Sequence, residues 1–266
     1  MKNSILILCT ALTVFSLTAF GYNSWNNNGS DQEKPSRSKT VIINDDLLNF
    51  LPKQADPDLV YNVDSRFINT ITKENLHNAK SIIDILPEKA TKSIVSYQEV
   101  DVIILQDKEI SEPGDGDILN TAQLKFIQSI DYSTNILIKA NYKIRNEFTG
   151  ELDEQYLTYY ITILPEKEAE FASGYEALIE YLKENSKEKT TIIRQDKLQP
   201  GKVSFTVTAK GEIAKVNLTS TSGYPSVDKA LVEMITNMPG KWNPATNAKG
   251  EKVNQELVFF FGQQGC

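Results

Sequence analysis

The chain has 266 residues, of which 28 are lysine or arginine and 35 are aspartate or glutamate, so its net charge is −7 at pH 7. This length predicts one or two domains, since a single hydrophobic core stops growing at roughly 250–300 residues. Binding to nucleic acid needs clustered basic residues, and the sequence has no basic stripe interleaved with aromatic residues. The totals therefore argue against a nucleic-acid-binding protein.

Residues 1–21 have the layout of a secretory signal peptide. Lys2 supplies a positive charge, residues 5–20 are apolar, and small residues at 19 and 21 precede the expected cleavage after Gly21. A retained membrane anchor over residues 4–22 is the alternative, although this segment is shorter than the ~20 residues of a typical spanning helix. In either case we expect the rest of the chain to lie in the periplasm or cell envelope.

The sequence offers few residues for metal or nucleophilic chemistry. Cys9 lies in the signal segment and Cys266 ends the chain, so cleavage leaves no pair for an internal disulfide. Cys266 could cross-link a homodimer, but an idle thiol is expected at a fraying terminus. His77 is the only histidine and is expected to face solvent. We therefore predict no metal, no cofactor and no enzymatic activity.

Residues 22–58 are expected to form a flexible linker, because they are rich in polar residues and poor in apolar ones. The following residues, 59–165, are predicted to form a small α+β domain of unknown role, with one buried sheet face. Helical spacing of Leu76, Ala79 and Ile83 predicts a helix over 72–84.

Further patterns complete this first domain. Asn120 followed by Gln123 predicts a capping box that opens a short helix. Alternation predicts a strand over 96–105 and an antiparallel hairpin of strands 135–144 and 157–164. The acidic cluster at 112–117 is expected to be a turn, because its spacing does not fit a calcium-binding EF-hand loop.

Residues 171–262 predict a second unit in the order α-β-β-α-β. Helices are expected over 174–188 and 224–240, a hairpin over 201–220, and a last strand over 253–261. The buried face of the first helix is expected to contain Tyr175, Leu178, Ile179 and Leu182. Ser226 is the expected N-cap of the second helix, which Pro239 ends.

This unit resembles the C-terminal domain of TonB-family proteins. The resemblance is carried by "GKVSFTVTAKGEIAKVNLTSTSGYPSVDKAL" from residue 201, "MPGKWNPA" from residue 238, the Gly250 turn and the closing "VNQELVFFF" from residue 253. It covers residues 171–262 and implies two helices packed on a three-stranded antiparallel sheet. It also implies capture of an extended peptide from an outer-membrane receptor along the sheet edge, with energy from an inner-membrane motor.

The last strand has apolar residues on both faces. Val253, Leu257, Phe259 and Phe261 are expected to face the helices, which leaves Val258 and Phe260 on the other side. We predict a partner-binding surface formed by Asn254, Glu256, Val258 and Phe260, on which a partner strand adds by β-augmentation. The alternative is that Val258 and Phe260 pack on the first domain or remain half exposed. Trp242 and Pro244 are expected to have structural roles, with the indole filling the core.

The predicted function is that of a cell-envelope protein-binding module. A TonB-type energy transducer is one alternative, although the N-terminal apolar segment has no histidine and residues 22–58 have three prolines only. An envelope hydrolase that uses Asp115 and Asp117 is the other alternative, and it lacks a histidine partner for a serine or threonine nucleophile.

Overall fold

The computed structural model describes residues 59–106, 108–194 and 196–263. The predicted signal segment, the predicted linker and Cys266 lie outside these residues. The described residues form a mixed α+β structure with two separate hydrophobic cores, each between a sheet and its helices. None of the described helices is long and apolar enough to cross a membrane.

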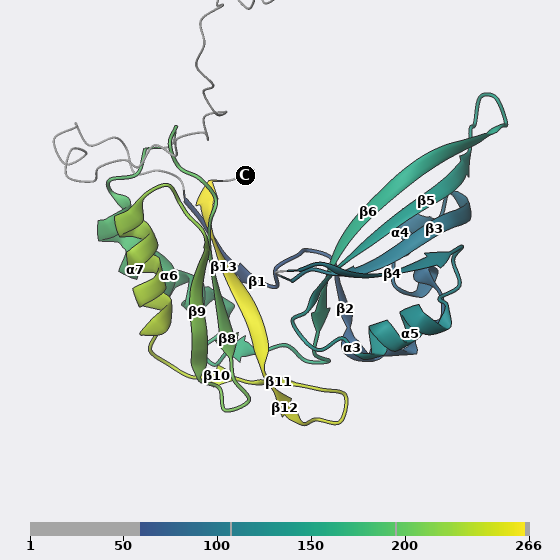
Figure 1. Ribbon diagram of the computed structural model, residues 1–266. Coiled ribbons are helices and arrows are strands. Elements are labelled where there is room, and N and C mark those ends of the chain that lie inside the picture. Colours follow the sequence, from purple (N-terminus) through teal and green to yellow (C-terminus); the bar gives the residue numbers. More distant parts are fainter. Residues whose placement is uncertain (1–58, 107, 195, 264–266) are drawn as a thin grey trace, which may run out of the picture. The chain divides into compact units, whose positions relative to one another are not determined.

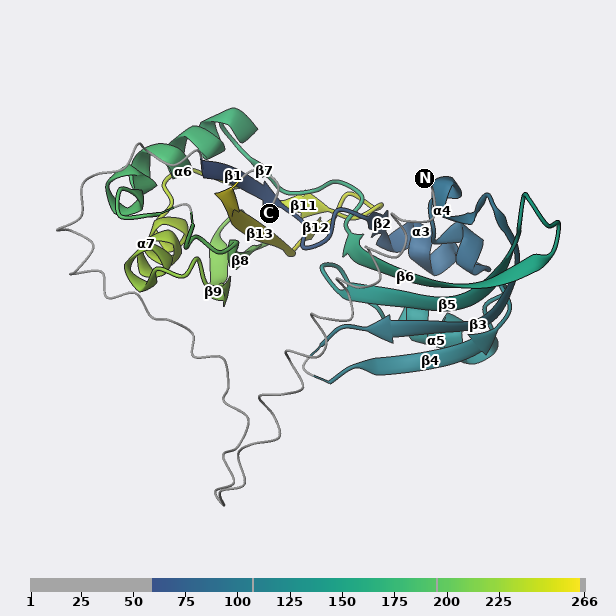
Figure 2. The same ribbon diagram turned by 90° about the horizontal axis from the view of Figure 1, so that it is seen from above.

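The first sheet has five strands in the order β2-β6-β5-β3-β4 (Figures 1 and 2). β2 runs parallel to β6, and the other neighbours are antiparallel. The strands are β2 (Thr70–Thr72), β3 (Ile94–Ile104), β4 (Ile110–Asp115), β5 (Asn135–Arg145) and β6 (Leu152–Leu164). One face packs against α3 (Lys73–Asn78), the 3-10 helix η1 (Ile82–Asp84) and α5 (Thr121–Gln128), while α4 (Glu88–Thr91) follows η1.

Most local predictions for this sheet are confirmed. The hairpin of β5 and β6 turns its predicted residues, such as Ile138 and Ile161, into the core. The capping box of α5 is present, with the Gln123 amide donating to Asn120 Oδ1 at 2.9 Å and the Asn120 amide donating to Gln123 Oε1 at 3.1 Å.

Two local predictions for this sheet are wrong. The helix expected over 72–84 ends at Asn78, because the Asp84 carboxylate accepts the Lys80 and Ser81 amides and starts the separate helix η1. Ile83 is consequently 48% exposed. The expected turn at 112–117 is largely strand, because β4 pairs with β3 as far as Asp115.

The second sheet has four strands in the order β1-β13-β8-β9, and α6 and α7 cover one face (Figure 1). Its strands are β1 (Leu59–Asp64), β8 (Gly201–Val207), β9 (Ile213–Ser220) and β13 (Gln255–Gln263), and its helices are α6 (Tyr175–Thr190) and α7 (Pro225–Thr236). Two short ladders flank it, β7 (Glu170–Phe171) with β10 (Trp242–Asn243) and β11 (Ala245–Thr246) with β12 (Lys252–Val253).

The element order from residue 171 is the predicted one, but the sheet is not three-stranded. β1 is a fourth strand, and it comes from residues that were assigned to the first domain. The predicted domain boundary at residue 59 is therefore wrong, because Leu59–Asp64 pack with the second core. On α6, Leu178 and Leu182 are buried as expected, whereas Tyr175 is 48% exposed.

The start of α7 also differs from its prediction. Tyr224 is the N-cap and Pro225 occupies the first turn, so Ser226 is not the cap. The buried Asp228 carboxylate instead fixes the preceding loop. It accepts the Ser222 amide at 2.8 Å and the Thr221 hydroxyl at 2.5 Å.

Trp242 lies in the second core, where its indole was expected. Its side chain is 6% exposed and packs edge-on against Phe171 and Phe205, with ring centroids 5.5 and 5.7 Å away. Gly211, in the turn between β8 and β9, has φ +79°, and a Cβ added there would collide with the Trp242 carbonyl oxygen and lie 3.8 Å from Pro244 Cδ. The "WNP" segment therefore closes against this turn.

The Gly211 contact gives a stability prediction with a matched control. Gly250 has φ +77°, and a Cβ added there meets no atom within 4 Å. Gly250→Ala should cost about 1 kcal/mol for the left-handed backbone, whereas Gly211→Ala should cost about 1–3 kcal/mol more because Trp242 has to move. Urea unfolding of both variants measures the difference. Equal losses would show that Trp242 does not pack closely on this turn.

Candidate partner-binding site

The last strand, β13, lies inside the second sheet and not at its edge. It pairs with β8 on one side and with β1 on the other, from Leu59 opposite Gln263 to Asp64 opposite Val258 (Figure 2). The interpretation that β13 offers a free edge is therefore wrong. The edge at which a partner strand was expected is filled by an antiparallel strand of the same chain.

Contacts with α6 and with two phenylalanines hold β1 in this position. Tyr61 Oη lies 2.7 Å from Ser186 Oγ, and the Tyr175 hydroxyl donates to Asn62 Oδ1 at 2.5 Å. The Tyr61 ring packs on Phe259 and Phe261, with centroids 6.0 and 5.4 Å away. Burial raises the pKa of the Tyr61 phenol, while its hydroxyl partners act in the opposite direction. β1 thus completes the second core.

The four predicted partner-binding residues lie in different environments. Asn254 Oδ1 accepts the Ala209 amide at 2.8 Å, and the Glu256 amide donates to Ser133 Oγ at 2.7 Å. Val258 and Phe260 face away from the helices, as the alternation predicts. Val258 is nevertheless 4% exposed. Phe260 is half-buried, and the ammonium of Lys202 lies 5.3 Å from the centre of its ring.

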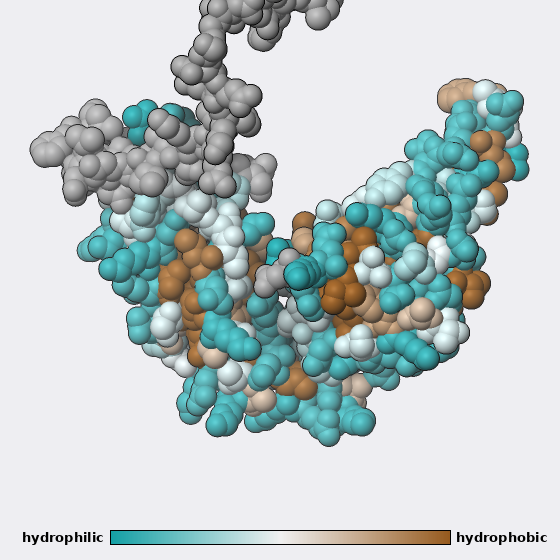
Figure 3. All heavy atoms as spheres, viewed as in Figure 1, coloured by the Kyte–Doolittle hydropathy of each residue, from teal (hydrophilic) through white to brown (hydrophobic). Residues whose placement is uncertain are grey.

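A groove of about 650 Å³ crosses the face of the second sheet that is turned away from α6 and α7. Val60, which is 40% exposed, and Phe260 supply apolar lining, and Lys202 and Arg66 supply positive charge. Apolar side chains also gather in patches on the mainly hydrophilic surface drawn in Figure 3. Asp64 lines the groove as well, so both signs of charge are present, and its apolar lining can accept apolar side chains of a ligand.

Glu256 lines a different pocket, together with Ser133 and Lys215, and its carboxyl is half-buried. Burial raises the pKa of Glu256 above its ordinary value of 4.5, although the charges of Arg66 and Lys215 oppose this effect. The folded protein therefore binds more protons here than the unfolded chain between these two pKa values, so stability falls as pH rises through that window.

Replacing Glu256 with Gln should remove this pH dependence. Glu256→Gln is expected to raise the midpoint of thermal unfolding at pH 7, and the gain should shrink towards zero below about pH 4, where both states are protonated. The exposed Glu180 on α6 provides a control, since Glu180→Gln should change the midpoint little at either pH. A gain of the same size at both pH values would contradict the burial effect.

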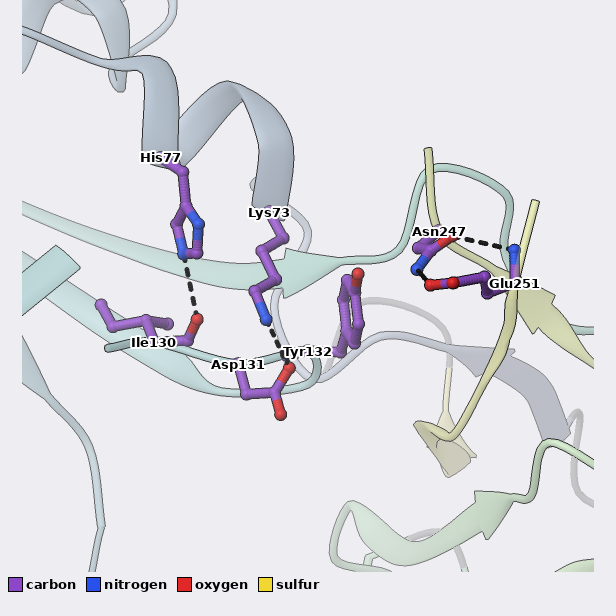
Figure 4. A network of polar contacts seen from close by, with 7 residues as sticks. All are labelled: Lys73, His77, Ile130, Asp131, Tyr132, Asn247 and Glu251. Atoms are coloured by element: carbon purple, nitrogen blue, oxygen red, sulfur yellow. Dashed lines mark hydrogen bonds and ion pairs between the residues drawn. The ribbon is translucent and has the colours of Figure 1, made fainter. Parts of the chain in front are cut away.

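The cluster around His77 is the other concentration of polar contacts, and its geometry is structural (Figure 4). His77 is half-buried, contrary to the expectation that it faces solvent, and its Nε2 lies 3.2 Å from the Ile130 carbonyl oxygen. Lys73 Nζ lies 2.9 Å from Asp131 Oδ1 and 4.6 Å from the centre of the Tyr132 ring. The hydrogen bond from Lys73 is the main reason that the pKa of Asp131 is lowered.

Asn247 and Glu251, also drawn in Figure 4, bond to each other across a turn. Asp115 ends β4, and the carbonyl of Asp117 accepts the Ile82 amide at 2.8 Å. Within the described ranges, no group of three or more His, Cys, Asp or Glu residues could hold a metal ion.

Strand β1 and the Asp228 contact were not predicted from the sequence. The alternation of Leu59, Tyr61 and Val63 was a signal for a strand, but the pattern is short and follows an irregular segment. Asp228, three residues after Pro225, was a signal for a side chain that caps the loop before the helix.

Comparison of the chain with protein-family models, with curated proteins and with solved structures gives no match.

Proposed function

We propose that this protein is a cell-envelope binding module whose C-terminal sheet accepts an extended strand along β13. The pairing of β13 with β1 is the observation that carries the proposal. β1 lies outside the segment α6-β8-β9-α7-β13, which has the element order of a TonB-family domain, and it pairs with β13 over six residues. An edge that accepts one antiparallel strand offers its backbone groups to any strand of suitable pattern.

The residue pattern of β1 indicates which kind of strand β13 can bind. Leu59, Tyr61 and Val63 point towards the helix-covered core, and Asn62 and Asp64 lie on the opposite face. A partner strand should therefore be apolar at every second position, with a central aromatic residue that packs on Phe259 and Phe261. In this proposal the partner takes the place of β1, and the Phe260 face contacts the flanking parts of the partner.

Replacement of β1 exchanges one set of backbone hydrogen bonds for another. The free-energy change of the replacement is then the difference between the free energies with which the two strands pair with β13. β1 has the advantage of being tethered, which corresponds to an effective concentration on the order of millimolar. The apparent affinity for a partner is therefore proportional to the fraction of molecules in which β13 is uncovered. Weakening β1 should strengthen partner binding.

A fluorescent peptide with the sequence of residues 58–65 tests this competition. We expect the full chain carrying Tyr61→Ala to bind the peptide about tenfold more tightly than the unchanged chain, because loss of the ring contacts uncovers β13 more often. Fluorescence anisotropy measures the affinity. Leu218→Ala, on the far edge strand β9, should leave the affinity unchanged.

Circular dichroism and thermal unfolding should show that the Tyr61→Ala chain remains folded. The proposal fails if a folded Tyr61→Ala chain binds the peptide no more tightly than the unchanged chain. It also fails if Leu218→Ala produces the same gain, since the gain would then not depend on uncovering β13.

A further inference from the structure

A second strand edge, on β6 of the first sheet, is open over most of its length. β5 covers one side of β6 from Leu152 to Thr162, but on the other side β2 covers just Thr162–Leu164. The Tyr160 carbonyl accepts the Asn69 side-chain amide at 3.2 Å. In the part of the chain that the structure describes, no strand lies beside the outer edge from Leu152 to Tyr159.

The side chains along this edge do not protect it well. Long unpaired edges recruit other strands unless prolines, bulges or charges prevent pairing. β6 contains no proline, and its register with β5 is regular from end to end. Tyr156 and Leu152 are 57% and 45% exposed. Its acidic residues, Asp153 and Glu154, lie at the end near the hairpin turn.

The hairpin turn at one end of this edge presents a fully exposed aromatic ring. Phe148 is 99% exposed. The turn is nevertheless well ordered, because Asn146 Oδ1 accepts the amides of Phe148 and Thr149 and the Arg145 guanidinium donates to the Gly150 carbonyl at 2.7 Å. An exposed phenylalanine on an ordered turn is suited to insertion into an apolar cavity.

A cavity with both polar and apolar lining lies at the other end of the same edge. It has a volume of about 630 Å³ and is formed between β2, β6 and the helices α3, η1 and α4. The buried residues Ile85, Leu86 and Ile161 contribute apolar lining. Ile68, which is 98% exposed, and Lys89 also line it. Lys89 has no ion pair among the described residues, and the hairpin turn carries the exposed acids Glu147 and Glu151.

We propose that two copies of the chain pair antiparallel through their β6 edges, with Phe148 of each copy in the cavity of the other. A twofold axis beside Tyr156 would place Leu152 opposite Tyr160 of the second copy. The Leu152–Tyr160 segment spans roughly 26 Å at 3.3 Å per residue. The turn of one copy then extends past Tyr160 of the other, towards the part of β6 where β2 begins and the cavity lies.

Two features favour a second copy over an unrelated peptide. The ring and the cavity lie at opposite ends of one edge, so a twofold axis uses both features twice. This register also places Asp153 and Glu154 opposite Tyr159 and Thr158, so carboxylates do not face each other.

Sedimentation equilibrium of the full chain, with Cys9→Ser and Cys266→Ser to remove other thiols, tests the dimer. The chain should dimerise, and Phe148→Asp should weaken dimerisation by about tenfold or more. The midpoint of thermal unfolding of the monomer should not change, because Phe148 is exposed there. Ile110→Asp, at the opposite edge strand β4, is the control and should leave dimerisation unchanged.

Cysteine cross-linking in the same background tests the register. Paired Cβ atoms across an antiparallel ladder lie about 4.5–5.5 Å apart, so Tyr156→Cys should form a disulfide-linked dimer on oxidation, and Val95→Cys should not. A monomeric chain would overturn the proposal, as would a dimer that is insensitive to Phe148→Asp or that fails to cross-link through Tyr156→Cys. The inference does not depend on the function proposed for β13.

Discussion

The antiparallel pairing of β1 with β13 is the interaction on which the second core depends. Without β1, the outer N–H and C=O groups of β13 would be unpaired, and the rings of Phe259 and Phe261 would lose the Tyr61 ring that packs on them. Unpaired backbone groups are costly unless water or another strand satisfies them. The protein satisfies them with six residues that come before the first sheet in sequence, and the hydrogen bonds to Ser186 and Tyr175 anchor that strand to α6.

Three of the strand edges in the described residues differ in how they are protected. The β13 edge is filled by β1. The β9 edge is irregular, because the register with β8 shifts near Lys215, whose φ is +50°. A bulge and a lysine are common protections against unwanted pairing. The β6 edge has neither protection, and this contrast is the reason that we assign it an occupant.

Local patterns predicted much of the fold, and long-range pairing accounts for most of what they missed. The element order from residue 171, the buried Trp242 and the capping box at Asn120 each follow from residues close together in sequence. The partner of β13 does not, because the pairing of Leu59 with Gln263 depends on the complete core. The early end of α3 depends on Asp84, whose carboxylate competes for amides that a continuing helix would use.

Long-range contacts are also the reason that the sequence predicted only part of the candidate site. Alternation correctly separated Phe260 from Phe259 and Phe261, but it could not show that Val258 is buried or that Asn254 bonds to the Ala209 amide. Alternation also gave no sign that the last strand lies inside the sheet, because the position of a strand depends on every other strand of that sheet. The resemblance to TonB-family domains led to the same assumption, because it implied three strands.

Hydrogen exchange of the β13 amides tests the central claim most directly. If β1 covers this strand, the β13 amides that face it should exchange slowly in the unchanged chain. In a chain carrying Tyr61→Ala, which removes the ring contacts between β1 and β13, the same amides should exchange much faster, while those that bond to β8 remain protected. Equal exchange of the β1-facing amides in both chains, with the fold intact, would show that β1 does not fill the edge of β13.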